Sequence, residues 1–332
     1  MRQVGITGVG SYLPEEVITN FDLEKIVDTS DEWIRTRTGI RERRRASSEE
    51  AASDLSLVAA EKALACAEVA AEDIDLIIVA TVTPDMFFPA TACLVQDRLG
   101  AKRAAAFDLS AGCSGFIYAL AVASQFIANG TYNTALVIGV DVLTKIINWE
   151  DRSTCVLFGD GAGAVILQPV EPGQGLLAVH LGADGSGGRF LEMPAGGSRQ
   201  PATLDTVKAK LHSIHMNGPE VFKFAVRILG EASLAVLEKA NLTKADIDFL
   251  IPHQANIRIV EAAIKRLGLE AEKVFVNLDR YGNMSSASIP VALDEAYREG
   301  KLKVGANVLL VSFGAGLTWG SAVLRWSLPP KG

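Results

Sequence analysis

The chain has 332 residues, of which 49% are hydrophobic, so it can bury a large core in one large domain or two ordinary ones. Its 32 Lys and Arg and 39 Asp and Glu give a net charge of −7, and the basic residues are scattered, which argues against a nucleic-acid partner. One basic cluster stands out, and we expect it to form a solvated turn with room nearby for a small anion: Arg41, Arg43, Arg44 and Arg45.

The amino-acid sequence also shows no targeting signal and no membrane-spanning segment. Residues 1–10 lead straight into an apolar strand pattern, without the charged, apolar and cleavage regions of a signal peptide. No window is apolar enough to cross a bilayer. The four cysteines are widely spaced and predict neither a disulfide framework nor a metal site: Cys66, Cys93, Cys113 and Cys155. We therefore expect a cytoplasmic protein without membrane insertion.

Taken in order, the chain repeats one pattern twice. Residues 71–80 resemble residues 244–253, and each stretch follows a helix-like segment. Each then precedes a second helical segment that ends in Arg-Leu-Gly, at 98–100 and again at 266–268. Because the period is far too long for a solenoid, the repeat indicates a duplicated domain.

Strands follow in matching order in both halves: 105–109 with 274–278, 134–140 with 307–313, and 163–167 with 321–325. Strands that alternate with helices predict layered α/β sheets. We expect two similar halves, 1–170 and 171–332, with the boundary in the Gly- and Pro-rich segment 169–218, which would loop over the surface. Residues 33–45 and 84–92 are predicted to be loop insertions, where substrate contacts are more frequent than core contacts.

A cysteine lies where a strand meets a helix. The strand 104–109, expected to be buried, ends in small residues around Cys113, and 116–128 then reads as a helix with almost no polar face. The positive end of the helix dipole would favour the thiolate form of Cys113. Taken alone, such a cysteine is more often a packing residue.

The duplication suggests partners for this thiol. Cys113 and Asn283 both begin helices after equivalent strands, and His253 ends the strand that matches 75–80. Alone, Asn283 would be a turn residue and His253 could equally be a structural histidine. The other histidines have no symmetry partner and are expected to be ordinary surface or core residues: His180, His212 and His215.

Cys, His and Asn together describe an acyl-transfer site that forms a thioester, because an imidazole and an amide N–H can stabilise a thioester oxygen that gains charge. Backbone N–H groups in 314–316 could join that of Cys113 in an oxyanion hole, although a tight strand turn explains them too. A papain-like hydrolase uses the same residue types, but its cysteine signature is absent. The glycines of 159–163 are predicted to turn into the strand 164–167 and not to bind a nucleotide.

Seven motifs spread over nearly the whole chain share one resemblance: DEWI at 31–34, RTGIR at 37–41, AGCSGF at 111–116, FGDGAGA at 158–164, PHQAN at 252–256, GN at 282–283 and FGAG at 313–316. In these motifs the chain resembles the β-ketoacyl-acyl-carrier-protein synthase III family of thiolase-like condensing enzymes. None of them is specific alone, but the combination is. The resemblance implies an α/β thiolase-like fold of duplicated halves in five layers, α-β-α-β-α.

The resemblance also implies the reaction, a decarboxylative Claisen condensation that initiates type II fatty-acid synthesis. Cys113 would take the acyl group of a short acyl-CoA, first of all acetyl-CoA, with the oxyanion on the N–H groups of Cys113 and Ala315. Malonyl-acyl-carrier protein would then lose CO2 while His253 and Asn283 stabilise the enolate. Acyl-CoA would be a substrate, and neither a cofactor nor a metal is implied.

Binding residues are implied in the same way. CoA would contact Trp33 and Arg152 at the adenine, Arg37 at a phosphate and Asn256 near the pantetheine. Phe87 and Phe88 match a loop that shapes the acyl pocket near the partner of a homodimer. The carrier protein would meet five residues, although Lys265 and Arg266 also fit an ordinary solvated helix: Lys223, Gln254, Arg258, Lys265 and Arg266.

Two departures leave the primer open: Met284 stands where many relatives have threonine, and 212–218 differs before its Met-Asn-Gly. A related enzyme of polyketide, quinolone or hydrocarbon synthesis therefore remains an alternative, with another acyl-CoA or acceptor. A non-catalytic scaffold subunit is disfavoured by the presence of Cys113, His253 and Asn283.

Overall fold

Two mixed β-sheets form the body of the molecule, and a computed structural model describes residues 1–330. The first sheet has the spatial order β1 (Val4–Tyr12), β7 (Asp160–Pro169), β6 (Ala135–Val142), β4 (Leu76–Ala80), β5 (Ala105–Leu109). The second has the order β11 (Phe249–Pro252), β12 (Asn307–Gly314), β13 (Thr318–Arg325), β8 (Gly175–Ala183). Each sheet comes from one half of the sequence; residues 331–332 of the expected second half lie outside the described residues.

The two sheets share one topology. In the first, β4 is parallel to β5 and β6, β6 is antiparallel to β7, and β7 to β1. In the second, β11 is parallel to β12, β12 is antiparallel to β13, and β13 to β8. A parallel bridge from Leu250 to Val274 takes the place of the β4–β5 pairing. The predicted duplication is confirmed.

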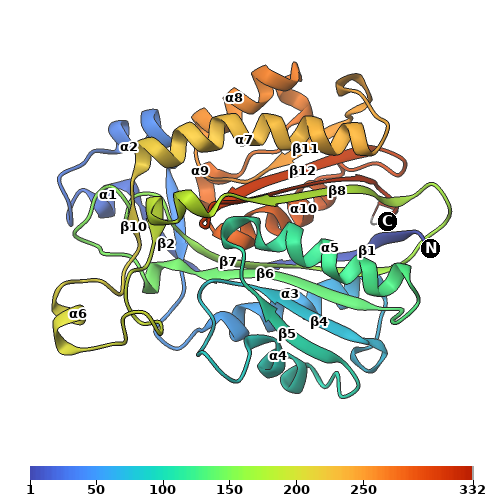
Figure 1. Cartoon of the computed structure of the whole chain (residues 1–332), viewed down its shortest axis with the longest axis horizontal. Helices are drawn as coiled ribbons and strands as arrows, with labels where there is room; N and C mark the ends of the chain where they lie inside the picture. The colour runs from blue at the N-terminus through green and yellow to red at the C-terminus, as the bar shows by residue number, and fades with distance from the viewer. Residues whose placement is uncertain (331–332) are drawn as a thin grey trace.

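Helices separate and cover the sheets (Figure 1). α3 (Ala52–Ala67) and α4 (Thr91–Leu99) pack on the outer face of the first sheet, and α7 (Gly218–Lys239) and α8 (Ile257–Leu267) cover the second. α5 (Gly115–Ala128) and α10 (Ser288–Arg298) lie between the sheets. This arrangement is the five-layer thiolase-like fold that the resemblance implied.

The central layer is buried because its helices are apolar on more than one face. In α5, Phe116, Ile117 and Leu120 are almost fully buried between the sheets, and only Gln125 is exposed. Each such large side chain contributes about 1.5–3 kcal/mol of transfer free energy on burial. The helix that follows Cys113 is thereby fixed from both sides.

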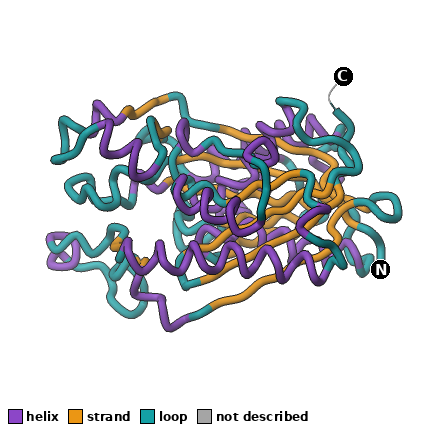
Figure 2. Tube along the Cα trace, turned by 90° about the horizontal axis from the view of Figure 1, so that it is seen from above, coloured by secondary structure: helices purple, strands orange, loops and turns teal. Residues whose placement is uncertain are grey.

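Short elements gather at the end of the molecule opposite to the chain termini (Figures 1 and 2). They include the antiparallel pairs β2 (Glu16–Thr19) with β3 (Glu42–Arg45) and β9 (Leu191–Glu192) with β10 (His215–Met216). The short helices are α1 (Asn20–Leu23), α2 (Asp31–Thr38), α6 (Leu204–Lys208) and α9 (Leu278–Tyr281). None of the helices within residues 1–330 is long and apolar enough to span a membrane.

The prediction of a loop over 33–45 is wrong, because this segment forms most of α2 and all of β3. Ser30 caps α2 by accepting a hydrogen bond from the Trp33 N–H (3.1 Å), and Gly39 ends it in the left-handed conformation. Arg43, expected in a solvated turn, is completely buried. Its guanidinium donates to the carbonyl oxygens of Ile18 and Val156.

Four expectations about strands also need correction. Residues 274–278 pair with the sheet only at Val274, and α9 begins at Leu278. β5 is partly exposed because it forms the open edge of its sheet. Within 169–218, the stretch Gly175–Ala183 is the strand β8 of the second sheet and not a surface loop. β7 begins at Asp160, inside the predicted glycine turn 159–163.

Gly163 of β7 lies directly against α10. A Cβ added there would lie 2.6 Å from the backbone nitrogen of Val291, so Gly163→Ala should force the helix away from the sheet. We predict a loss of about 1–3 kcal/mol in the free energy of unfolding, measured with urea. Gly197→Ala is the control, because Gly197 is exposed with no atom within 4 Å of the added carbon. Equal stability of the two variants would contradict this packing.

Candidate active site

The turn of Cys113 touches the turn between β12 and β13. Cys113 lies in a 3₁₀ turn, Gly112–Ser114, that leads into α5. A Cβ on Gly112 would lie 2.7 Å from the backbone nitrogen of Ala315, and one on Gly314 would overlap the backbone nitrogen of Cys113. Only glycine fits at these two positions, so the N–H groups of Cys113 and Ala315 come close together from opposite halves of the chain.

Cys113, His253 and Asn283 line one cavity of about 330 Å³. Its walls include the aromatic side chains Phe158, Phe222 and Phe313. The structure thus brings together the three side chains that the sequence singled out. A thiol, an imidazole and a carboxamide in a largely apolar cavity are suited to acyl transfer.

His253 follows β11 and is only 1% exposed. Its backbone N–H donates to the Val311 carbonyl (2.8 Å), and its ring lies edge-on to Phe313 with centroids 5.5 Å apart. Neither ring nitrogen has a hydrogen-bond partner among residues 1–330. Burial lowers the pKa of His253 to about 3, so the imidazole is neutral and has a free N–H to donate.

Asn283 is held by its backbone and by one side of its amide. Its N–H donates to the Leu157 carbonyl (2.8 Å), and its carbonyl accepts from the Gly159 N–H (3.1 Å). Its side-chain Oδ1 accepts from the Ser285 N–H at 2.8 Å, which leaves the amide NH2 group as the donor toward the cavity.

Cys113 differs from the expectation of a stabilised thiolate. The thiol borders the cavity but is densely surrounded elsewhere, and burial raises the pKa of Cys113 to about 12. The nearby Ser285 hydroxyl lowers this pKa only in part. Desolvation therefore outweighs the helix N-terminus, and the free site holds a neutral thiol.

Asp141 of β6 is a site residue that the sequence analysis missed. It is completely buried, and burial raises its pKa. Its carboxylate accepts hydrogen bonds from the N–H groups of Val82 (2.8 Å) and Ser286 (3.1 Å), which joins a loop of the first half to the turn after Asn283. An acidic residue in the otherwise apolar strand pattern of 135–142 was the available signal.

Ser285, also missed, lies between Asp141 and Cys113. It lowers the pKa of both groups, although its Oγ makes no well-formed hydrogen bond within the described chain. Its φ of 48° is unusual for a serine. The left-handed backbone at this position directs the chain from Asn283 into α10.

A second cavity of about 200 Å³ also borders Cys113. Most of its lining is apolar and was not predicted: Val82, Leu143, Ile146, Phe158, Leu191 and Ile214. These residues come from distant segments, so no local pattern could identify them. Phe87 and Phe88 are 81% and 84% exposed and line neither cavity near Cys113 of their own chain.

Trp33, Arg37 and Asn256 line the first cavity. The guanidinium of Arg152 lies 5.4 Å from the centre of the Trp33 ring and donates to the Asp28 carbonyl (2.7 Å). A flat ring enters between Trp33 and Arg152 only if Arg152 moves away. Asn256 also caps α8, where its Oδ1 accepts from the Arg258 N–H (2.9 Å).

Four of the five expected carrier-protein residues are exposed on α7 and α8: Lys223, Arg258, Lys265 and Arg266. Arg258 lies over Phe222 at the cavity, whereas Lys265 and Arg266 are in the last turn of α8. The prediction for Gln254 is wrong, because this side chain is completely buried. Its amide donates to the carbonyls of Pro252 (2.8 Å) and Phe275 (3.1 Å).

The fold and the cavity together define an acyl-transferring enzyme of thiolase-like fold. Family models support this class: 3-oxoacyl-[acyl-carrier-protein] synthase III matches residues 107–185, and the C-terminal model of the same family matches residues 237–326. The β-ketoacyl-[acyl-carrier-protein] synthase III of Symbiobacterium thermophilum is 64% identical, with 98% of this chain and 99% of the relative covered.

Solved structures agree. The synthase III of Thermus thermophilus has a TM-score of 0.91 at 51% identity, covering 97% of this chain and 99% of the other. The priming β-ketosynthase of the R1128 polyketide pathway has a TM-score of 0.91 at 36% identity, covering 99% and 98%. The chain belongs to the 3-oxoacyl-[acyl-carrier-protein] synthase III family of condensing enzymes, which are acyltransferases.

The raised pKa of Cys113 predicts its reactivity in the free enzyme. Because the thiolate is the reactive form, the rate of Cys113 alkylation by iodoacetamide should rise about tenfold per pH unit from pH 7 to 9. Peptide mass spectrometry distinguishes Cys113 from Cys66 and Cys93, which serve as internal references. A rate that is already constant above pH 7 would show that the helix N-terminus outweighs burial.

Proposed function

We propose that this enzyme condenses a short acyl-CoA primer, first of all acetyl-CoA, with malonyl-acyl-carrier protein. The products are 3-ketoacyl-acyl-carrier protein, CoA and CO2, which begins a fatty-acid chain. One observation carries the proposal: Cys113, His253 and Asn283 line a single apolar cavity, with two backbone N–H groups beside the thiol.

In the first half-reaction, Cys113 Sγ attacks the thioester carbonyl of acyl-CoA. The N–H groups of Cys113 and Ala315 stabilise the oxyanion. The bond from the carbonyl carbon to the CoA sulfur breaks, and the thiol proton ends on that sulfur. Since the free thiol is neutral, it loses its proton only as the new C–S bond forms.

In the second half-reaction, the thioester oxygen of malonyl-acyl-carrier protein accepts hydrogen bonds from the His253 ring N–H and the Asn283 amide. Loss of CO2 moves the bonding pair into an enolate, whose oxygen both donors stabilise. The enolate carbon attacks the acyl group on Cys113, a C–C bond forms, and the sulfur leaves as a thiolate that takes a proton from water to restore the neutral thiol. Decarboxylation drives the step, so the proposal includes no metal or redox cofactor.

Substrate binding is assigned to the mouth of the cavity. CoA would lie along Trp33, Arg37 and Asn256, with Arg152 closing over the adenine. Lys223 and Arg258 are exposed near the cavity and would receive the acidic carrier protein, and Lys265 and Arg266 would extend this surface along α8.

We also propose a homodimer in the cytoplasm. The open edge of β5 and the exposed Phe87 and Phe88 are features that a second copy would cover. Phe87 and Phe88 would then border the acyl pocket of the partner. The four free cysteines are consistent with a reducing compartment.

A second candidate function is a priming condensation in polyketide synthesis. The cavity behind Cys113, about 200 Å³, exceeds the space of an acetyl methyl group, since a water molecule occupies about 30 Å³ in the liquid. A primer longer than acetyl therefore fits. Product analysis with malonyl-acyl-carrier protein, malonyl-CoA and several acyl-CoA primers distinguishes the two functions.

The proposal predicts a covalent intermediate. Incubation with acetyl-CoA should add one acetyl group to the protein, and peptide mass spectrometry should place it on Cys113. Cys113→Ala should take up none, since it has no nucleophile. If folded enzyme fails to be acylated at Cys113 by acetyl-CoA and by every longer acyl-CoA tested, the proposed function is wrong.

The two half-reactions should respond differently to loss of the side-chain donors. His253→Ala and Asn283→Ala should each slow CO2 release from malonyl-acyl-carrier protein by about 10²–10³-fold, the usual effect of losing one such donor. Acylation of Cys113 should change far less, because backbone N–H groups serve that step. Rapid-quench measurement of both steps decides, and equal losses in both would contradict these roles.

A further inference from the structure

The two side-chain donors come from different segments that must be held at a fixed separation. His253 follows β11, whereas Asn283 follows α9, Leu278–Tyr281. A helix of a single turn has little stability of its own. The position of Asn283 relative to His253 therefore depends on what holds α9 in place, together with the backbone bonds of Asn283 to Leu157 and Gly159.

Gln254 ties the start of α9 to the end of β11. Its Nε2 donates to the Pro252 carbonyl at 2.8 Å, next to His253, and its Oε1 accepts from the backbone N–H of Asn277 at 3.0 Å. Asn277 is the residue directly before α9. Gln254 and Asn277 are both completely buried, so water does not compete for these bonds.

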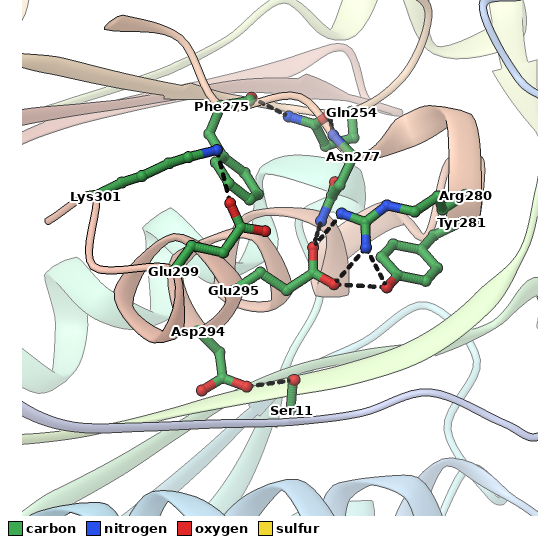
Figure 3. A network of polar contacts seen from close by, with 10 residues as sticks. All are labelled: Ser11, Gln254, Phe275, Asn277, Arg280, Tyr281, Asp294, Glu295, Glu299 and Lys301. Atoms are coloured by element: carbon green, nitrogen blue, oxygen red, sulfur yellow. Dashed lines mark hydrogen bonds and ion pairs between the residues drawn. The ribbon is translucent and has the colours of Figure 1, made fainter. Parts of the chain in front are cut away.

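Glu295 of α10 holds both ends of α9 (Figure 3). Its Oε2 accepts from Asn277 Nδ2 (2.8 Å) and from the Arg280 guanidinium (3.0 Å). Its Oε1 accepts from the Tyr281 hydroxyl (2.6 Å). Tyr281 is separated from Asn283 only by Gly282, so one carboxylate fixes the turn on which the amide donor lies.

The hydrogen bonds to the Glu295 carboxylate are stronger than hydrogen bonds between neutral groups. The side chain of Glu295 is 15% exposed, and hydrogen bonds to an ionised carboxylate are about twice as strong as those between neutral groups. Without the carboxylate, the buried amide of Asn277 would lose its acceptor. The Cys113 turn has supports that do not involve α9: the Cys113 carbonyl accepts from Ser312 Oγ of β12 (2.8 Å), and the Gly112 carbonyl accepts from Ser286 Oγ (3.0 Å).

We propose that Glu295 is a positioning residue for the decarboxylation step. By fixing α9 between β11 and α10, it places the Asn283 amide so that it and the His253 N–H reach the same thioester oxygen. This inference rests on the proposed function. A misplacement of about 1 Å in such a site can cost about 10²-fold in rate.

The test compares two buried or nearly buried carboxylates on α10. Glu295→Ala should slow CO2 release from malonyl-acyl-carrier protein by about 10–100-fold and leave Cys113 acylation within about twofold. Glu295→Gln, which keeps oxygen and nitrogen atoms at the same place, should recover part of the loss. Asp294→Ala is the control, since Asp294 is 1% exposed and contacts Ser11 and Arg298 but not α9.

Asp294→Ala should lower stability without a selective effect on decarboxylation. The inference is overturned if Glu295→Ala slows both half-reactions equally, slows neither, or behaves like Asp294→Ala. If Glu295→Ala does not fold, Glu295→Gln and Tyr281→Phe decide by the same ratio of rates. Wild-type enzyme that is not acylated and releases no CO2 would refute the proposed function itself, which separates the two failures.

Discussion

The structure depends on one close backbone contact between its two halves. Gly112 and Gly314 leave no space for a side chain, so the turn of Cys113 packs directly on the turn of Ala315. This contact brings the backbone N–H groups of Cys113 and Ala315 close together. The central helix α5 starts from the Cys113 turn. The other central helix, α10, follows the turn Ser285–Ala287, where the Ser286 hydroxyl donates to the Gly112 carbonyl (3.0 Å).

Burial also determines the charge state of the site. It raises the pKa of Cys113 and lowers that of His253, so both are neutral in the free enzyme. A neutral cavity binds an uncharged thioester without a large desolvation cost, and its N–H donors interact most strongly when the oxygen gains charge. The acidic groups nearby, Asp141 and Glu295, do not face the thioester; they hold the turns that carry the donors.

The sequence predicted the strands and helices that recur in the same order in both halves of the chain. The duplication was visible in matched strands and helices, and it correctly related Cys113, His253 and Asn283. It failed at 274–278, where Gln254 and Asn277 bind each other and the chain leaves the sheet for α9. The prediction of a thiolate at Cys113 was wrong because desolvation depends on the packing of both halves. The cavity lined by Ile146 and Ile214 was not predicted because its walls come from distant segments.

We propose that donors from two loops, the His253 ring N–H and the Asn283 amide, meet at one thioester oxygen. A crystal structure of the enzyme with a malonyl-thioester analogue that cannot lose CO2 tests this most directly. We expect the thioester oxygen to lie about 2.7–3.2 Å from both a ring nitrogen of His253 and Nδ2 of Asn283. An analogue bound in the cavity with its oxygen on the N–H groups of Cys113 and Ala315, and on neither side chain, would contradict it.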